Sequence, residues 1–578
     1  MAETLVSPGV LARENDSSFV TQGPVTVGAA IIGPTVKGPV EIPTVVTSYS
    51  DYTSKFGTTL TSASNEYTYF TSIAAYNYFN NGGESLLVSR VVSGSFTSAT
   101  SYNSNNNPEI SGSDNTGTLV LKTISEGVIM NSSSSLDSSG SLESGSSDNI
   151  RWEISNPSTS SGTFDLLVRR GDDNTNNRIV LETWTGLSLD PKSDNYVARV
   201  IGDQVENFNG NTSDPQVTIT GSYRNASRYI YVSQVLRPTP DYFDNNGIAK
   251  TIYTGYIPAA QSGSFGNATG DVIGGAKFYD NIEANNAQGI GSSSYDGMIA
   301  LLSNQDDYVY NAIFAPGLYN EGQTSQCTNL INNTQVRGDA LFVLDLVDYG
   351  SSITNAVGQA ASRNTSYAAS YYPWLQVIDP DTGAMVWVPA STMIAGVYAY
   401  NDAVSEPWFA PAGINRGGLS QVIRAERKLS QSNRDTLYTN KVNPIATFPG
   451  TGVVVYGQKT LQTRASALDR VNVRRLLIQL KSYISQVAQN LVFEQNTIAT
   501  RNNFLAQVNP YLESVQQRQG LYAFKVIMDD TNNTADVIDR NQLIGQIYIQ
   551  PTKTAEFIYL DFNILPTGAT FPAQKIKS

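Results

Sequence analysis

The sequence predicts a multidomain α/β (α+β) protein, with an α/β core, inserted mostly-β domains and extended arms at both ends. At 578 residues, the chain has length for about three or four domains. Residues 280–410 alternate between helical and strand patterns, whereas residues 98–279 hold short strand patterns separated by turn clusters. Residues 411–565 then carry an amphipathic pattern at helical spacing, which indicates a further α/β domain.

The first segment is expected to be an extended N-terminal arm, residues 1–20, because Pro8-Gly9 and the polar run at 14–18 disfavour a helix. The first part of the core follows over residues 21–97. Its predicted elements are a strand at 25–31, a helix at 67–79 and a strand at 86–92.

Residues 98–279 are interpreted as one or two mostly-β, surface-exposed insertions. Within them, residues 131–148 contain 10 serines. Such a segment is expected not to bury enough apolar surface to offset its ordering entropy. The predicted strands are 118–124, 151–154, 164–168, 216–220 and 228–232.

Residues 280–410 form the second part of the core. Alternation of helices and strands there predicts a mainly parallel sheet covered by helices. The predicted helices are 295–302, 327–332 and 353–361, and the predicted strands are 310–314, 340–345 and 374–378.

Residues 411–565 form the predicted C-terminal α/β domain. Apolar residues from Val473 to Leu491 follow the three, four and seven spacing of an amphipathic helix over about 470–493. A second helix is predicted at about 499–518, tolerating or bending at Pro510. Predicted strands follow at 521–528, 544–550 and 557–564, and residues 566–578 are expected to form a C-terminal arm.

The composition excludes several chemistries. The chain has no histidine and one cysteine, Cys327. Histidine-dependent catalytic triads, histidine-ligated zinc, intrachain disulfides and cysteine-rich metal sites are therefore excluded. Cys327 is interpreted as a buried, inert thiol. We expect no catalytic residue, no cofactor and no metal site. Neither a secretory signal nor an apolar run near 18 residues is found.

Charge is unevenly distributed along the chain. The formal net charge is −13, which disfavours a nucleic-acid coat. Residues 415–481, by contrast, carry 12 Lys and Arg against three acidic residues. This basic stretch predicts a face for an acidic partner. A solvated helix face with local pairing remains an equal alternative.

Two local patterns imitate ligand-binding motifs. Residues 452–460 resemble a phosphate loop, but Gln458 separates the second glycine from Lys459, and Val453 to Val455 are typical of a strand. Residues 172–176 place oxygen ligands at alternate positions but lack the glycine and distal glutamate of a calcium loop. A strand and a polar turn are the favoured interpretations.

Several ordered segments resemble the tail sheath proteins of contractile-tailed bacteriophages. No single motif is specific, but their order along almost the whole chain is; only the serine-rich segment has no counterpart. The segments are Val6-Ser7-Pro8-Gly9-Val10, residues 33–43, residues 163–169, residues 187–193, residues 407–417, the helix at 471–494 and the block 520–562.

The resemblance implies a structural subunit that polymerises as stacked hexameric rings around an inner tail tube. Contraction would then drive the tube through the host envelope during genome delivery. Implied partners are other copies of the chain, the inner tube protein, and baseplate and tail terminator proteins, with no direct nucleic acid and no membrane insertion. The implied location is the virion tail, assembled in the host cytoplasm.

Particular residues are expected to make these contacts. According to the resemblance, the arms would add strands to neighbouring subunits. The basic residues on the polar side of the helix at 470–493 are expected to face the tube, with pairing inside the chain or contact with another subunit as an equal alternative. The arm residues are Val6, Ser7, Pro8, Gly9, Val10, Phe571 and Pro572, and the tube-facing residues are Arg470, Arg474, Arg475 and Lys481.

Two other functions remain open. The Tyr- and Asn-rich insertions would also suit a glycan-binding or glycan-cleaving tail component, because paired carboxylates hydrolyse glycosides without histidine. A sheath of a secretion machine would share the mechanism and differ only in setting.

Overall fold

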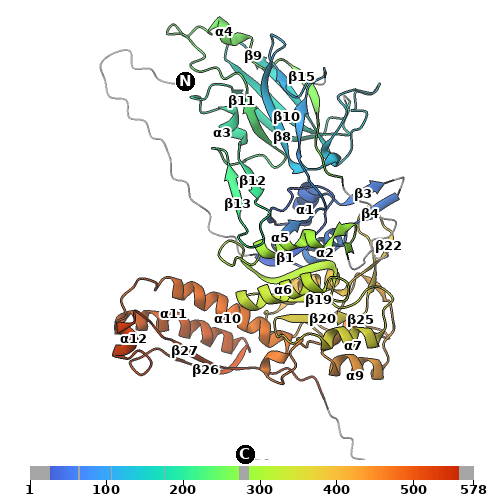
Figure 1. Ribbon diagram of the computed structural model, residues 1–578, viewed down its shortest axis with the longest axis vertical. Helices are drawn as coiled ribbons and strands as arrows, with labels where there is room; N and C mark the ends of the chain where they lie inside the picture. Colours follow the sequence, from blue (N-terminus) through green and yellow to red (C-terminus); the bar gives the residue numbers. More distant parts are fainter. Residues whose placement is uncertain (1–26, 63–64, 106, 175, 272–284, 559–578) are drawn as a thin grey trace, which may run out of the picture. The chain divides into compact units, whose positions relative to one another are not determined.

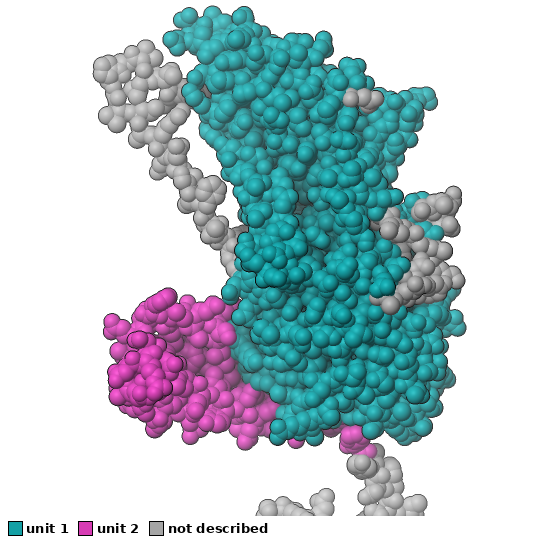
Figure 2. Space-filling view, in the orientation of Figure 1, with its two compact units in different colours: residues 1–483 teal, residues 484–578 magenta. Residues whose placement is uncertain are grey.

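The computed structural model describes residues 27–62, 65–105, 107–174, 176–271 and 285–558. The chain divides into two compact units, residues 1–483 and 484–578, coloured separately in Figure 2. Both arms expected from the sequence lie outside the described residues. None of the described helices is long and apolar enough to cross a membrane.

The core of the first unit is an eight-stranded sheet in the order β2-β5-β1-β18-β19-β20-β24-β25. Figure 1 labels four of these strands, β1, β19, β20 and β25. The strands from β5 to β24 run parallel, and the edge strands β2 and β25 are antiparallel to their neighbours. The mainly parallel sheet predicted from the helix–strand alternation is thus confirmed. The bounds are β1 (Val27–Gly33), β2 (Thr44–Val46), β5 (Leu86–Arg90), β18 (Tyr310–Tyr319), β19 (Leu341–Asp345), β20 (Ala368–Tyr372), β24 (Val442–Phe448) and β25 (Gly452–Val455).

Alternate side chains of the central strands enter two separate apolar clusters. Ile31, Phe314 and Val343 pack on one face, against α2 (Phe70–Asn80) and α8 (Ala390–Val404). Their sequence neighbours, such as Ile313 and Phe342, pack on the other face. That second face is covered by α5 (Tyr295–Leu301), α6 (Thr324–Arg337) and α7 (Ile353–Ala361). Because both faces are covered, these strands are continuously apolar rather than alternating.

The insertion forms its own antiparallel sheet around Trp152 and Phe164, which are fully buried. Its entry strand pairs directly with its exit strand, because Tyr102 lies opposite Ser264. The strand order is β11-β10-β9-β15-β6-β8-β14. The bounds are β6 (Ser98–Tyr102), β8 (Gly117–Glu126), β9 (Ile150–Ser158), β10 (Thr163–Arg170), β11 (Val180–Ser188), β14 (Ile230–Val235) and β15 (Gln261–Gly266).

The serine-rich segment at 131–148 is ordered, contrary to expectation. Hydrogen bonds, rather than buried apolar side chains, hold most of this segment in place. The Asp137 carboxylate accepts from the amides of Ser139 and Ser141 at 2.8 and 3.0 Å. The Asn149 side chain donates to two carbonyl oxygens of the segment. Leu142 is the one large apolar side chain of the segment that is buried.

The second unit contains a helix over a two-stranded antiparallel sheet. Helix α10 (Val471–Gln489) runs into this unit, and α11 (Ile498–Gln517) follows it, uninterrupted at Pro510. The sheet consists of β26 (Leu521–Ile527) and β27 (Gln546–Pro551), and α11 packs against β26. The predicted elements of this region are therefore confirmed as far as residue 550. Residues 557 and 558 are not in a strand, and residues 559–564 lie outside the described residues.

Two parts of the core differ from prediction. The core strand after α7 is β20, whereas the predicted strand at 374–378 forms β21 (Leu375–Ile378) of a separate three-stranded sheet. Helix α8 was not predicted. It is buried on nearly all sides and rich in small residues, so its sequence has no polar stripe to reveal the helical period.

Candidate functional site

Helix α10 carries the four basic residues expected to face a tube. Its first ten residues are almost entirely enclosed: Val471 to Leu476 are all buried. This part of the helix has no polar side. The expectation that all four basic residues lie on an exposed polar side is therefore wrong for Arg474 and Arg475.

Arg475 links three elements of the first unit. Its guanidinium donates to the Asp402 carboxylate of α8 at 2.5 Å and lies 4.6 Å from the ring centre of Tyr398. The Tyr398 hydroxyl is 2.9 Å from the hydroxyl of Tyr371, on β20. Burial alone would lower the pKa of Arg475, but the Asp402 carboxylate and the two tyrosines raise it. This is an internal anchor between α10, α8 and the core sheet.

Arg474 is held in the same way on the neighbouring surface of α10. It donates to the Ser366 hydroxyl and stacks 3.9 Å from the ring centre of Tyr367. Burial lowers the pKa of its guanidinium. A stacked arginine keeps its charge while its flat face is covered, so an aromatic ring can take the place of solvent.

The other two basic residues are more accessible. Arg470 is half-buried and pairs with Asp469 at 3.0 Å. Lys481 is exposed, and its ammonium group donates to the Tyr367 hydroxyl at 3.2 Å. The arm residues Val6 to Val10, Phe571 and Pro572 lie outside the described residues.

The motif-like segments have structural roles. Val453 to Val455 are buried in β25, and the Lys459 ammonium donates to the carbonyl of Tyr438, so the strand interpretation is confirmed. Cys327 is buried, as expected, and burial raises the pKa of its thiol to about 12. Among the described residues, no group of three or more Cys, Asp or Glu side chains is arranged to hold a metal ion.

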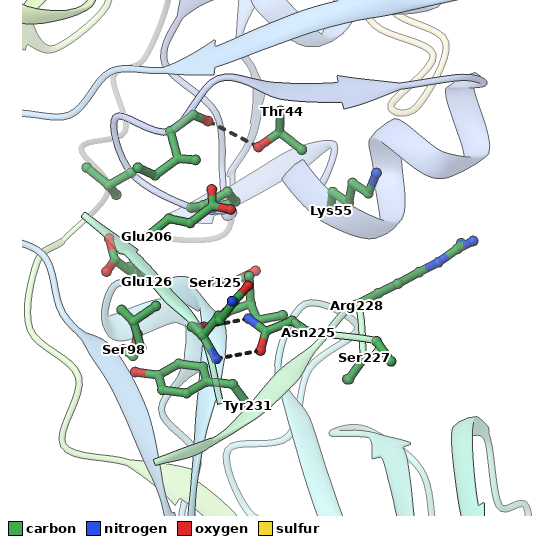
Figure 3. Close-up of a pocket in the computed structure, with 17 residues that line it drawn as sticks. Thr44, Lys55, Ser98, Ser125, Glu126, Glu206, Asn225, Ser227, Arg228 and Tyr231 are labelled. Atoms are coloured by element: carbon green, nitrogen blue, oxygen red, sulfur yellow. Dashed lines mark hydrogen bonds between the residues drawn. The ribbon is translucent and has the colours of Figure 1, made fainter. Parts of the chain in front are cut away.

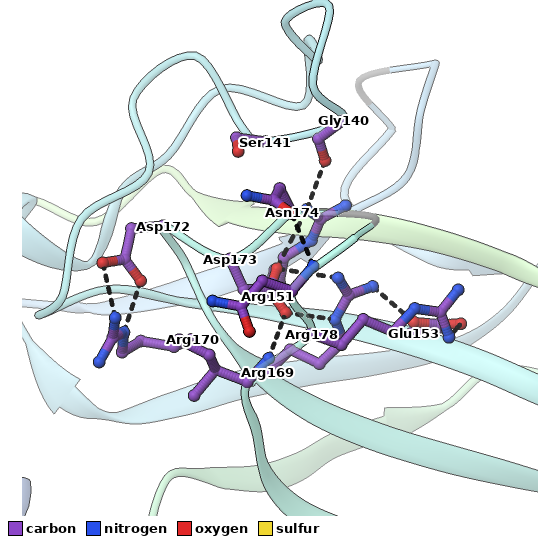
Figure 4. A network of polar contacts seen from close by, with 12 residues as sticks. Gly140, Ser141, Arg151, Glu153, Arg169, Arg170, Asp172, Asp173, Asn174 and Arg178 are labelled. Carbon is purple, nitrogen blue, oxygen red and sulfur yellow. Dashed lines mark hydrogen bonds and ion pairs between the residues drawn. The ribbon is translucent and has the colours of Figure 1, made fainter.

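Residues 172–176, which partly match a calcium loop, lie within a network of arginine side chains (Figure 4). Asp173 is buried and accepts from Arg169 at 2.6 and 2.9 Å and from Arg151 at 3.4 Å. Arg169 also contacts Glu153 at 2.5 Å. Arg151 reaches the carbonyl oxygen of Gly140 at 3.1 Å, which ties the serine-rich segment to the sheet.

A cavity of about 300 Å³ lies where the core meets the insertion (Figure 3). Thr44 and Lys55 line it from the core, and Glu126, Asn225 and Tyr231 line it from the insertion. Burial raises the pKa of the Glu126 carboxyl to about 7.

Beside that cavity, Arg90 joins the core to the insertion. It is fully buried and donates to the carbonyl oxygens of Gly38 at 2.6 Å and Glu126 at 3.0 Å. Nearby, Lys37 donates to the carbonyl oxygen of Asp148 at 3.2 Å.

The small sheet of the second unit is the part whose hydrogen bonding is incomplete. Among the described residues, β26 and β27 pair only with each other. One face rests on α11, whereas the other exposes Tyr522 (63%) and Tyr548 (56%). Both outer edges therefore present backbone donors and acceptors that a further strand can satisfy. Sequence periodicity predicted the strands but contained no signal for their missing neighbours.

The structure thus combines an α/β core, an inserted β domain and a terminal two-stranded sheet whose outer edges are open among the described residues. Residues 291–461 match the phage tail sheath protein central domain, and residues 463–565 match the phage tail sheath C-terminal domain. Residues 291–461 and 463–565 are thus similar to these two sheath domains, and the resemblance seen in the sequence is confirmed over them.

Individual relatives agree with this assignment. The chain is 40% identical over 233 residues to the tail sheath protein of Vibrio phage KVP40, covering 40% of this chain and 35% of that protein. It is 41% identical over 185 residues to that of Enterobacteria phage T4, covering 32% of this chain and 28% of the relative. For Salmonella phage ViI the identity is 33% over 287 residues, covering 46% of each chain. The matched part thus spans less than half of each relative.

The fold itself recurs in a sheath tail protein from Listeria innocua. That crystal structure matches 91% of this chain and 96% of its own, with a TM-score of 0.52 at 10% identity. The predicted multidomain α/β fold class is confirmed.

Proposed function

We propose that the chain is a structural subunit of a contractile tail sheath, which polymerises as stacked hexameric rings around an inner tube. The observation that carries the proposal is the open-edged sheet of β26 and β27, within a segment that matches the sheath C-terminal domain. A two-stranded sheet is marginally stable in water, and added strands supply main-chain hydrogen bonds. Such a sheet suits a subunit that is completed by its neighbours.

The arms are the proposed donors of those strands. Residues 1–20 and 566–578 of neighbouring subunits would pair with the outer edges of β26 and β27. This contact is head-to-tail, as an open polymer requires. Because it depends on backbone hydrogen bonds of the arms and not on the surfaces of the subunit bodies, the bodies can rotate while the arms keep them joined.

Contraction then needs a metastable polymer and a lower-energy end state rather than an active site. We propose a non-enzymatic role, in which shortening of the sheath drives the tube through the host envelope. The proposed organisation has core segments at 21–97 and 280–410, an insertion at 98–279 facing outward, and a tube-facing domain at 411–565.

The tube contact is proposed for the accessible residues Arg470 and Lys481. Exposed ion pairs contribute about 0–1 kcal/mol each, so such a contact would release during contraction. Arg474 and Arg475 would support it from inside, by fixing α10 to the core. Baseplate and terminator proteins at the ends of the sheath complete the proposed virion tail, assembled in the host cytoplasm.

Electron microscopy of the purified protein tests the proposal. Striated tubes or stacked rings are expected, and a variant lacking residues 1–18 should remain folded but form none. Val336→Ser, at an exposed position outside both arms, serves as the control. Normal tubes without residues 1–18 would contradict the arm contact. Release of saccharides from a host polysaccharide would instead support the glycan-cleaving alternative.

A further inference from the structure

The turn between α10 and α11 carries an apolar side chain that the described protein leaves entirely uncovered. Phe493 is 103% exposed, and its neighbour Val492 is 60% exposed. Phe493 also has φ = +70°, in the left-handed region that a bulky residue rarely adopts and that favours glycine. The chain thus keeps a phenyl ring where both solvation and backbone conformation favour another residue.

This turn is held in place on both sides. The amides of Leu491 and Glu494 donate to Ala488 and Leu491 carbonyl oxygens at 2.9 and 3.0 Å. On the other side, the side-chain amide of Asn496 donates through its nitrogen to the Gln542 carbonyl oxygen at 2.9 Å. The oxygen of the same side chain accepts from the Arg501 guanidinium at 2.7 Å. A side chain presented by a pre-ordered turn loses little conformational entropy when it binds.

A matching basin lies on the first unit. It is open, has a volume of about 630 Å³, and is lined by Tyr367, Ala465 and Leu468 together with polar side chains. Arg464 lies on its lining, is exposed, and makes no ion pair among the described residues. Glu494, next to Phe493, is also exposed and unpaired within the described chain.

We propose that Phe493 of one copy of this chain inserts into the Tyr367–Leu468 basin of a second copy, where Glu494 pairs with Arg464. An apolar side chain and a complementary pocket at different places on one molecule generate a head-to-tail contact, which builds a closed ring or an open polymer depending on whether its rotation closes. The complementary charges fix which partner is accepted. This contact rests on the proposed polymer but is separate from the arms.

Charge reversal tests the contact through the critical concentration for assembly, measured by pelleting and checked by electron microscopy. Glu494→Lys alone and Arg464→Glu alone should each raise it about tenfold, because like charges then meet. The chain carrying both substitutions should assemble as the unaltered protein does.

An equimolar mixture of the two single variants separates contact between copies from contact within one chain. In the mixture, opposite charges can meet only across copies. The lysine introduced at position 494 then faces the glutamate introduced at position 464, and the native Glu494 of one variant faces the native Arg464 of the other. Restored assembly supports the proposal. Normal assembly of each variant alone, or failure of both the mixture and the double variant, overturns it.

Two further variants address the ring itself. Phe493→Gly should melt at the same or a higher temperature, because glycine fits the backbone, yet raise the critical concentration about thirtyfold. Val336→Ser is the control, because Val336 is also apolar and 87% exposed. It should change neither the melting temperature nor the critical concentration. If Phe493→Gly assembles normally, the proposal is wrong. If the unaltered protein forms no polymer, the proposed function fails first.

Discussion

The core sheet and the small sheet of β26 and β27 differ in how the hydrogen-bonding groups at their strand edges are satisfied. Both faces of the core sheet are covered, and its β25 edge is closed by residues 413–419, which exchange backbone hydrogen bonds with Val453 and Val455. The small sheet has one covered face and, among the described residues, two open edges. The β25 edge is thus covered within one chain, whereas the edges of the small sheet are the ones proposed to accept strands from another copy. On that proposal, folding and assembly depend on different parts of the molecule.

The largest expected effect lies on the folding side, in the insertion. Asp173→Ala leaves the buried Arg151 without its carboxylate partner and Arg169 with Glu153 alone, and should destabilise the insertion by about 4 kcal/mol. Chemical denaturation followed by tryptophan fluorescence, to which the insertion contributes Trp152 and Trp184, would measure it. Asp172→Ala is the adjacent control: its pair with Arg170 is about one third exposed, so a loss below about 1 kcal/mol is expected. Equal losses for both variants would contradict the network.

On the assembly side, hydrogen exchange should distinguish the two sheets directly. Outer-edge amides of β26 and β27 should exchange quickly in the monomer and about a hundredfold more slowly in the polymer, because added strands would protect them. Amides of β18 and β19 should be slow in both states. Mass spectrometry of peptides covering 521–527 and 546–551 makes the measurement, and unchanged exchange on assembly would argue against strand addition.

The buried pair of α10 gives a smaller folding effect. Asp402→Ala removes the partner of Arg475 and should cost about 2 kcal/mol, since Asp402 is itself 31% exposed. Lys481→Ala, on an exposed position of the same helix, should cost less than about 0.5 kcal/mol. Thermal unfolding of both variants shows whether α10 is anchored as described. A larger loss of stability for Lys481→Ala than for Asp402→Ala would contradict the anchoring role of the Arg475–Asp402 pair.

The smallest expected effect is a dependence of stability on pH, which arises from Glu126 in the cavity between the core and the insertion. Burial raises the pKa of Glu126 to about 7, so the folded chain binds a proton that the unfolded chain has released above pH ~4.5. Stability should therefore fall as the pH rises from about 4.5 to 7. Glu126→Gln should be about 1 kcal/mol more stable than the unaltered protein at pH 8 and equal to it at pH 4. Melting curves at both pH values test this.

The sequence predicted regular elements well where one local period dominated. The apolar pattern of α10 and the helix–strand alternation after residue 280 are examples, because apolar residues recur there at a regular spacing. It failed where burial is complete. Helix α8 has no polar stripe, and Arg474 and Arg475 look solvent-facing although tyrosine rings cover them. The open edges of β26 and β27 were also beyond prediction, because pairing depends on tertiary placement and not on the strand's own residues.

The entry and exit of the insertion lie side by side: Thr97 donates its amide to the Thr269 carbonyl at 3.1 Å, and their hydroxyl groups are 3.1 Å apart. The two cut ends of the core are thus already in register for a short linker. A gene encoding this protein could lose the whole β domain, or exchange it for an unrelated one, without rerouting a single core strand. Residues 97 and 269 therefore mark a single site of the core at which a different domain could be inserted, by evolution or by protein engineering.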